Sequence, residues 1–115
     1  MKKALATCWL LLSAAQAHAG WIGGVDIADT NVGADGTAFL GLTTPPPNSC
    51  NFWAWHFRFD ATTSGGKSLL ALVLTAKTAN KKVNVWYTDS TAPGTNQTNG
   101  CNGNSIGVLT GLSIP

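Results

Sequence analysis

The stretch CNFWAWHFRFD, residues 50–60, carries the strongest structural pattern in the chain. From its fourth residue onward, large aromatic side chains alternate with smaller or polar ones. A period of two is typical of a strand with one buried face. We therefore predict that one face of this strand belongs to the core and that the other faces outward. The inward set is Trp53, Trp55, Phe57 and Phe59, and the outward set is Ala54, His56, Arg58 and Asp60.

Two strands are predicted before this stretch, and a helix and two strands after it. An Asp-Gly pair at residues 35–36 favours a tight turn between the first two strands, and the first of these is Gly-rich and expected to be bent or bulged. Thr63 or Ser64 is a candidate helix cap, and Asn80 suits the left-handed position that ends a helix. The predicted strands are residues 21–32, 37–43, 50–60, 82–88 and 105–114, and the predicted helix is residues 64–79.

Hydrophobic spacing predicts which side chains of these later elements face inward. In the helix the inward set is Leu69, Leu72, Val73 and Ala76, and further leucines cover a second face that a neighbouring molecule could bury. In the fourth strand Val83, Val85 and Tyr87 share one face, which leaves Trp86 on the less apolar one. In the last strand the shared face is Ile106, Val108, Thr110, Leu112 and Ile114.

The first 19 residues are typical of an export signal. Lys2 and Lys3 precede an apolar stretch too short to span a bilayer, and Ala17–Ala19 is a small-x-small cleavage site. We expect a cleaved chain, residues 20–115, that forms a single domain in the periplasm of a bacterium or outside the cell, without a membrane span. Cleavage lowers the net charge from +2 to 0, so the composition gives no indication of a nucleic-acid partner.

The predicted order, strand-strand-strand-helix-strand-strand, matches the OB-fold, a five-stranded, partly open barrel in a mainly β domain with one helix. In that fold the third and fifth strands are parallel neighbours, so Cys50 and Cys101 would lie close together. A pair of cysteines in an exported chain indicates a disulfide. It would close a loop of about 50 residues and stabilise the domain by about 4 kcal/mol. The alternative fold is a small α+β sandwich with the helix across an antiparallel sheet.

From residue 50 onward the chain resembles known proteins. The run GKSLLALVLTAKTANKKVNVWYTDS, then a cysteine, then SIGVLTGLSI, resembles a group of small uncharacterised exported proteins of Gram-negative bacteria. The order of helix, basic link, Val-x-Val strand and terminal Gly-Leu-Ser strand resembles the B subunits of AB5 toxins, in particular the subtilase cytotoxin B subunit. That resemblance implies a disulfide-containing OB-fold, a pentameric ring and the binding of cell-surface glycans, but no binding residue.

The loop at residues 89–104 is rich in Asn, Thr and Gln and contains no basic residue. Amides and hydroxyls satisfy the donors and acceptors of a sugar, and this loop borders the usual binding surface of an OB-fold. Trp86 is a candidate stacking platform. The alternatives are a solvated loop, and a Trp86 packed beneath the helix or between subunits. The candidate ligand-binding residues are Trp86, Asn96, Gln97, Asn99 and Asn102.

Signals for catalysis are weak. Residues 103–107, GNSIG, fit the G-x-S-x-G nucleophile motif, but that motif requires a helix after the serine in a large α/β sheet, and here a strand is predicted. His56 has no nucleophile or second base beside it in the sequence. One histidine, scattered aspartates and two bridged cysteines form no metal-ligand cluster.

We therefore expect a non-catalytic binding module without cofactor or metal. Its expected partners are a cell-surface glycan and further copies of itself in a ring. The alternative is an envelope protein that binds or inhibits another protein, and the least favoured reading is a small hydrolase that uses Ser105 or His56.

Overall fold

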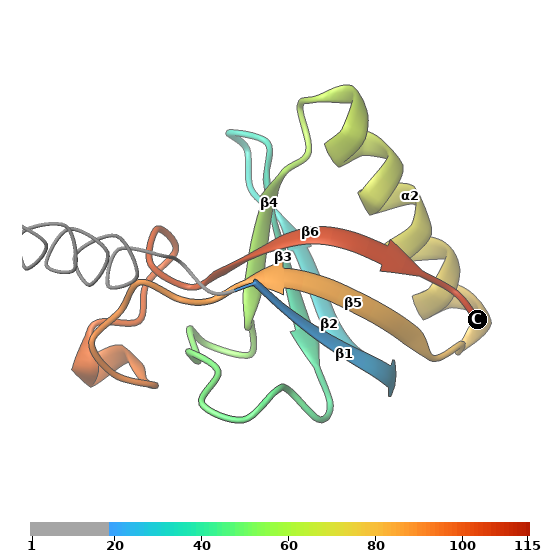
Figure 1. Ribbon diagram of the computed structural model, residues 1–115. Coiled ribbons are helices and arrows are strands. Elements are labelled where there is room, and N and C mark those ends of the chain that lie inside the picture. The colour runs from blue at the N-terminus through green and yellow to red at the C-terminus, as the bar shows by residue number, and fades with distance from the viewer. Residues whose placement is uncertain (1–18) are drawn as a thin grey trace, which may run out of the picture.

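The computed structural model describes residues 19–115, so the predicted export signal lies outside the described residues apart from Ala19. Within them, the protein is mainly β with one α-helix, and six strands form one mixed sheet (Figure 1). The helix α2 (Ser64–Ala79) packs across the sheet, and a short 3₁₀ helix, η1 (Gln97–Asn99), lies in the loop after β5. The strands are β1 (Ala19–Val25), β2 (Ile27–Val32), β3 (Thr37–Leu42), β4 (Phe57–Asp60), β5 (Val83–Thr88) and β6 (Gly107–Ser113).

The strand order is β1-β5-β6-β4-β3-β2. All neighbours are antiparallel except β4 and β6, where Phe57 pairs with Gly107. The predicted parallel contact between these two segments is therefore confirmed. The strands at the two edges, β1 and β2, are joined by Asp26 alone, so the sheet coils until its edges approach one another there. No ladder joins those edges and the sheet is not closed, so the predicted five-stranded barrel is not confirmed.

The first predicted strand, residues 21–32, is divided in two. Pairing between β1 and β5 is regular up to Ile22 and then shifts register before Val25. Gly24 adopts a φ of 67°, a left-handed conformation that glycine tolerates. The carbonyl of Asp26 accepts a hydrogen bond from the Thr43 backbone N–H at 3.0 Å. The predicted bend is therefore a break between two strands. The strand β1 pairs with β5 at one edge of the sheet, and β2 pairs with β3 at the other edge.

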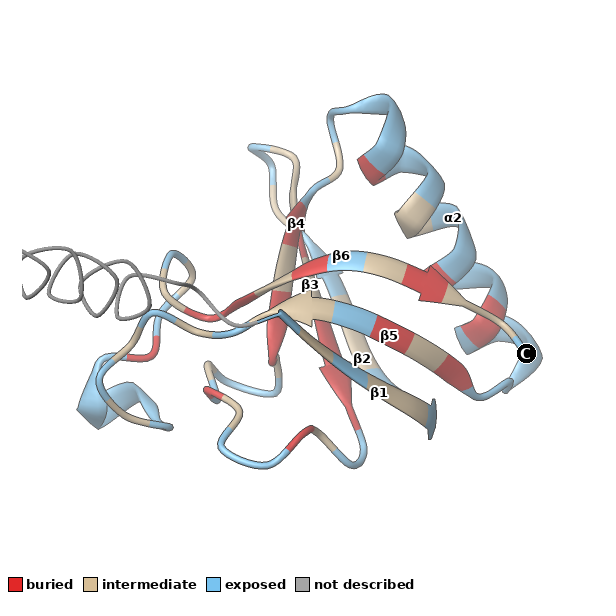
Figure 2. Ribbon diagram, viewed as in Figure 1, coloured by how far each residue is buried: buried red, intermediate tan, exposed pale blue. Residues whose placement is uncertain are grey.

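The core lies between the sheet and α2, as the buried segments in Figure 2 show. Val83 and Val85 are fully buried, as the alternation predicted. Leu112 is buried as predicted, Ile106 is buried just before the strand, and Ile114 packs against the core. The prediction fails in the middle of β6, where Leu109 is buried and Thr110 is exposed. A register shift between β5 and β6 explains the error, because an irregular pairing interrupts the alternation of faces.

The helix begins and ends where the sequence predicts. The Thr63 hydroxyl accepts a hydrogen bond from the Gly66 N–H at 2.9 Å, and Asn80 ends the helix with a φ of 54°. Gly66 lies directly against the backbone carbonyl of Asp60, in a space too small for a side chain. This contact sets the rotation of the helix: the stripe at Leu69, Leu70, Val73 and Ala76 faces the core. The predicted inward position of Leu72 is wrong, since 38% of it is exposed.

The aromatic stretch that led the sequence analysis is a strand only over its last four residues. Phe57 and Phe59 are buried in the core, as predicted. Trp53 is instead 69% exposed, and His56, predicted to face outward, is 7% exposed. A two-residue turn precedes β4: the backbones of Phe52 and Trp55 exchange two hydrogen bonds of 3.0 Å. The turn reverses the chain and breaks the alternation, so the period-two pattern continues in the sequence where the strand does not.

The Cys50–Cys101 disulfide is confirmed, with a Cα–Cα distance of 5.7 Å. Cys50 lies seven residues before β4 rather than at its start. With Ile106 the two cysteines form a second, smaller buried cluster. The disulfide therefore fastens the loop after β5 to the segment that precedes β4. In the part of the chain that the structure describes, no helix is long and apolar enough to cross a membrane.

Candidate functional site

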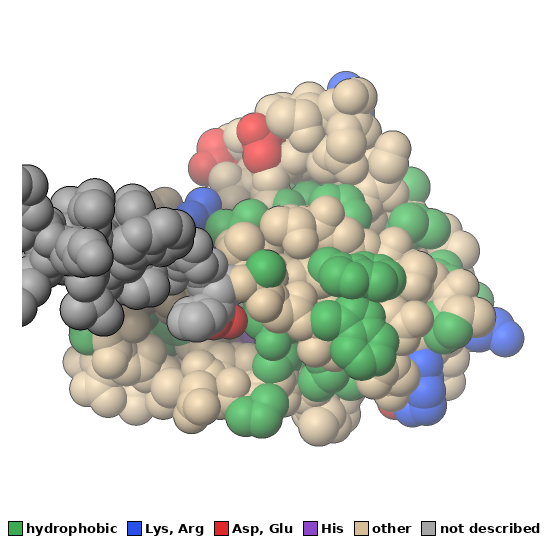
Figure 3. Space-filling view, viewed as in Figure 1, with side chains coloured by type: hydrophobic (Ala, Val, Ile, Leu, Met, Phe, Trp, Pro, Cys, Tyr) green, Lys and Arg blue, Asp and Glu red, His purple; other side chains and the backbone are tan. Residues whose placement is uncertain are grey.

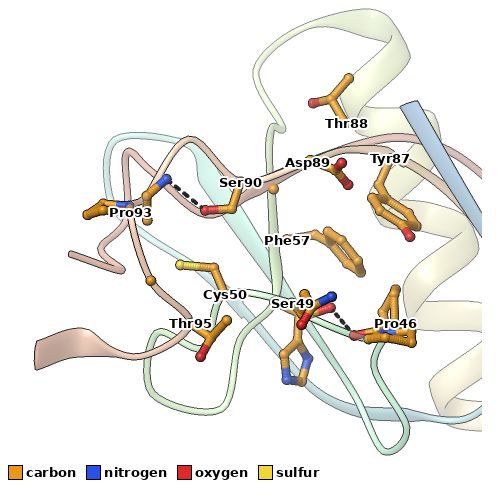
Figure 4. A pocket seen from close by; sticks show the side chains of 16 residues that line it. Pro46, Ser49, Cys50, Phe57, Tyr87, Thr88, Asp89, Ser90, Pro93 and Thr95 are labelled. Carbon is orange, nitrogen blue, oxygen red and sulfur yellow. Dashed lines mark hydrogen bonds between the residues drawn. The ribbon is translucent and has the colours of Figure 1, made fainter. Parts of the chain in front are cut away.

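A pocket of about 370 Å³ opens between residues 46–50 and the loop that follows β5 (Figure 4). The end of β5 and the start of β4 contribute to its lining, and the disulfide links residue 50 to the loop that follows β5. The lining residues are Pro46, Pro47, Asn48, Ser49, Cys50, His56, Phe57, Tyr87, Thr88, Asp89, Ser90, Ala92, Pro93, Gly94, Thr95 and Gly107.

Tyr87 and Asp89 are the groups best placed to meet a ligand. The Tyr87 ring lies beside the buried Phe57 ring, with centroids 4.8 Å apart, and Asp89 lies next to both in Figure 4. Burial, and then the negative charge of Asp89, raise the pKa of Tyr87, so its hydroxyl stays protonated as a hydrogen-bond donor. Among the described residues, neither the Tyr87 hydroxyl nor the Asp89 carboxylate has a hydrogen-bond partner.

The two serines in the pocket have structural roles. The Ser49 hydroxyl donates to the Pro46 carbonyl at 2.6 Å. The Ser90 hydroxyl donates to the Ser105 carbonyl at 2.6 Å and accepts from the Ala92 N–H at 3.0 Å. These bonds shape the walls, so the polar groups left for a ligand come from other residues.

His56 is bonded to the backbone of β3. Its ring Nδ1 accepts a hydrogen bond from the Leu42 backbone N–H at 3.0 Å, and the backbone N–H of His56 donates to the Leu40 carbonyl at 2.9 Å. An Nδ1 that accepts places the proton of the neutral ring on Nε2. Burial lowers the pKa of His56, which favours this neutral form. Nδ1, the unprotonated ring nitrogen that a general base would use, is therefore already bonded to the Leu42 backbone N–H.

Ser105, the serine of the G-x-S-x-G match, is not paired with a base among the described residues. The Ser105 hydroxyl donates to the Gly100 carbonyl at 2.7 Å and accepts from the Asn102 N–H at 2.9 Å. It makes no hydrogen bond with His56, and the strand β6 follows it where a nucleophile motif requires a helix. No group of three or more His, Cys, Asp or Glu side chains suited to a metal ion occurs within residues 19–115.

The predicted loop amides lie on the surface but not in the pocket. The Asn96 side chain accepts from the Asn99 N–H at 3.0 Å and from the Thr98 hydroxyl, and so caps η1. The Asn102 side chain accepts from the Asn104 N–H at 2.8 Å. Gln97 lies within η1 and is exposed. Since Asn96 and Asn102 use these oxygens to hold the loop, their first role is structural.

Trp86 lies apart from those amides. It is 42% exposed on the outward face of β5, and its ring centroid is 6.5 Å from that of Trp21, its partner across β1. The Trp86 ring rests over Gly111 of β6. Figure 3 shows hydrophobic side chains gathered over this part of the sheet, whereas in Figure 1 the loop with η1 extends away from it. The structure therefore does not bring Trp86 and the predicted loop amides together.

A second group of aromatic side chains, named here the aromatic cluster, consists of Phe39, Phe52, Trp53 and Trp55. Phe39 and Trp55 are stacked with centroids 4.8 Å apart, and Phe52 meets the edges of both neighbouring tryptophans at 5.8 to 6.3 Å. The Trp55 Nε1–H donates to Asp29 at 2.8 Å. Trp53 is the most exposed member of the cluster.

Sequence reasoning assigned Trp53 to the core, and the signal against that assignment is subtle. Phe52 is a large aromatic residue out of phase with the alternation that begins at Trp53. In a strand with one buried face, large aromatic residues are expected on that face only. Adjacent aromatic residues at Phe52 and Trp53 would lie on both faces, and a turn at this point accounts for them.

Comparisons with known proteins add no relative to this description. No protein-family model, no curated protein and no solved structure matches the chain. The resemblance to toxin B subunits therefore stays a hypothesis, and the function is argued from the geometry of the site.

Proposed function

We propose that this protein is an exported, non-catalytic binding module whose pocket takes a neutral saccharide of a cell-surface glycan. The observation that carries the proposal is the chemistry of the pocket. It combines an aromatic hydroxyl and a carboxylate that lack partners among the described residues with Thr88, Thr95 and Asn48 on its walls. Sugars present many hydroxyls and an apolar ring face, which suit such a mixture of polar groups and aromatic surface.

The charge of the pocket favours a neutral ligand over an anionic one. Asp89 is its single carboxylate, and no lysine or arginine is among the described lining residues. An ionised carboxylate accepts hydroxyl donors strongly but repels a phosphate or a carboxylate. This argues against nucleotides, phosphopeptides and acidic sugars as ligands.

We extend the proposal to fold and assembly. The strand order, with the two edge strands continuous through Asp26, supports an OB-like coil of the sheet. Leu72 and Leu74 on the outer side of α2 and the Trp21–Trp86 pair on the sheet are exposed apolar side chains that subunit contacts in a ring would cover. The native mass of the oxidised, exported protein tests this assembly: a closed ring is expected, and a monomer at all concentrations would contradict it.

The test of the binding function uses oxidised protein expressed through a bacterial export pathway and a panel of neutral and acidic glycans. Asp89→Asn is expected to weaken binding at least about tenfold, because it removes a charged hydrogen-bond acceptor. Asp35→Asn is the matched control, since it makes the same change in an exposed turn outside the pocket. Equal affinities of the two variants, or binding of acidic glycans alone, would contradict the proposal.

One observation favours the alternative, a module that binds another envelope protein. The Trp21–Trp86 pair lies beside β1, whose outer edge has no partner strand among the described residues. A partner strand could add to such an edge, with the tryptophans giving specificity. Trp86→Thr separates the two functions: it would abolish capture of an envelope protein, whereas it is expected to leave glycan binding unchanged.

A further inference from the structure

We propose that the turn at residues 52–55 is a second contact site for the saccharide, in which the exposed Trp53 indole stacks on the apolar face of a sugar ring. The inference rests on the proposed function for its class of ligand. It concerns a different surface, because Trp53 is not among the residues that line the pocket. It also replaces Trp86 with Trp53 as the aromatic partner of the polar loop.

The conformation of Trp53 is the first observation. Its φ is 56°, in a left-handed region that a bulky residue rarely adopts. Hairpin turns that require a positive φ at the first central position normally use Gly or Asn there. The strained backbone is kept by the paired hydrogen bonds between Phe52 and Trp55 and by the stacking of Trp55 on Phe39. The fold therefore retains a strained residue at this position and exposes a large apolar ring there.

The attachment of the polar loop to this turn is the second and independent observation. The Asn51 N–H donates to the Thr95 carbonyl at 2.9 Å, so the start of the turn is tied to the loop. Further along the loop, Gly103 lies against the rings of Phe39 and Phe52; a Cβ placed on it would be 3.5 and 3.6 Å from them. The loop that carries the hydroxyl and amide side chains is thus fastened to the turn that carries the exposed indole, and a sugar stacked on that indole would need such polar partners.

The charges around the aromatic cluster do not suit a nucleic acid. Asp29 is bonded to Trp55, and the Arg58 Nη2 is directed onto the Asn104 carbonyl at 3.0 Å. A nucleic acid would need a basic surface to attract its phosphates. A membrane surface would need several exposed aromatic side chains with basic neighbours. A single exposed indole on a turn that is fastened to a polar loop fits one sugar ring best.

The experiment labels the oxidised, exported protein with 5-fluorotryptophan and titrates it with lactose, maltose and N,N′-diacetylchitobiose. Trp53→Phe identifies the fluorine resonance of Trp53, and that resonance is expected to shift with the sugar. Trp53→Gly is then expected to bind about tenfold more weakly, while its urea midpoint stays equal or rises because glycine accepts the positive φ. Trp86→Thr is the control, and its affinity is expected to be unchanged.

The outcomes separate this inference from the proposed function. If Asp89→Asn loses affinity while Trp53→Gly does not, the pocket function stands and the role of Trp53 is refuted. If none of the three sugars binds or shifts a resonance, the pocket function and the role of Trp53 are both refuted for this ligand class. Binding to phosphatidylcholine vesicles that depends on Trp53, without sugar binding, would overturn the inference in favour of a membrane contact.

Discussion

Replacement of His56 tests how the wall of the pocket is held in place. In the folded protein the His56 Nδ1 is the acceptor for the buried Leu42 N–H. His56→Phe keeps an aromatic ring but leaves that N–H without a partner, which costs about 1–3 kcal/mol. His56→Asn places an oxygen at the same distance along the side chain, so it is expected to lose clearly less stability. Urea unfolding at pH 7.5, followed by tryptophan fluorescence, measures both variants.

The same residue makes stability depend on pH. Burial lowers the pKa of His56 below its ordinary value of 6.5, so the unfolded chain takes up a proton at this residue before the folded one does. The free energy of unfolding is therefore expected to be insensitive to this group above about pH 6.5 and to fall as the pH drops below it. The fall ends once the pH is below the lowered pKa. One proton corresponds to at most about 1.4 kcal/mol per pH unit.

His56→Asn cannot titrate, so its unfolding free energy should lose this component between pH 7.5 and pH 5. The reasoning about His56 would be refuted if the asparagine variant kept the full pH dependence of the wild type. It would also be refuted if His56→Phe were as stable as the wild type at pH 7.5, because the Leu42 N–H would then need no acceptor.

Four further outcomes are expected. The double variant Cys50→Ser and Cys101→Ser should lose about 4 kcal/mol of unfolding free energy, since the disulfide closes a loop with a sequence separation of 51; an unchanged urea midpoint would count against this. Gly66→Ala should destabilise the protein by about 1–3 kcal/mol in the same assay, because its Cβ would overlap a backbone carbonyl. Gly65→Ala, with open space around its Cβ, should instead stabilise by about 0.5–1 kcal/mol, and the opposite order would show that the helix packs differently. Exported protein should lack residues 1–19, which its intact mass measures.

The candidate site was predicted less well than the fold. The loop after β5 is polar and exposed, but the side-chain oxygens of Asn96 and Asn102 accept backbone N–H groups of the same loop, which depends on how the loop folds back on itself. Tyr87 was assigned to the core, and it does contact Phe57 there. Tyr87 nevertheless also lines the pocket, because it lies at the end of β5, where the loop that forms one wall begins.

The sequence by itself determined the features whose causes are local. The helix, its Thr63 cap and its left-handed end at Asn80 follow from residues within one turn of each end. The turn at Gly36, with a φ of 87°, follows from the Asp-Gly pair. The cysteine pair indicated the disulfide, since the two cysteines that follow the predicted export signal have one way to pair.

Only the tertiary structure decided what becomes of the stretch CNFWAWHFRFD. Its alternation is the same whether the chain runs straight or turns at Trp53, because the pattern records side-chain type and not direction. The turn places Trp53 at the surface, and His56 is buried because the Leu42 N–H, from a strand fourteen residues away, needs an acceptor there. Long-range hydrogen bonds of this kind depend on which strands meet, and that information is not contained in any local window of the sequence.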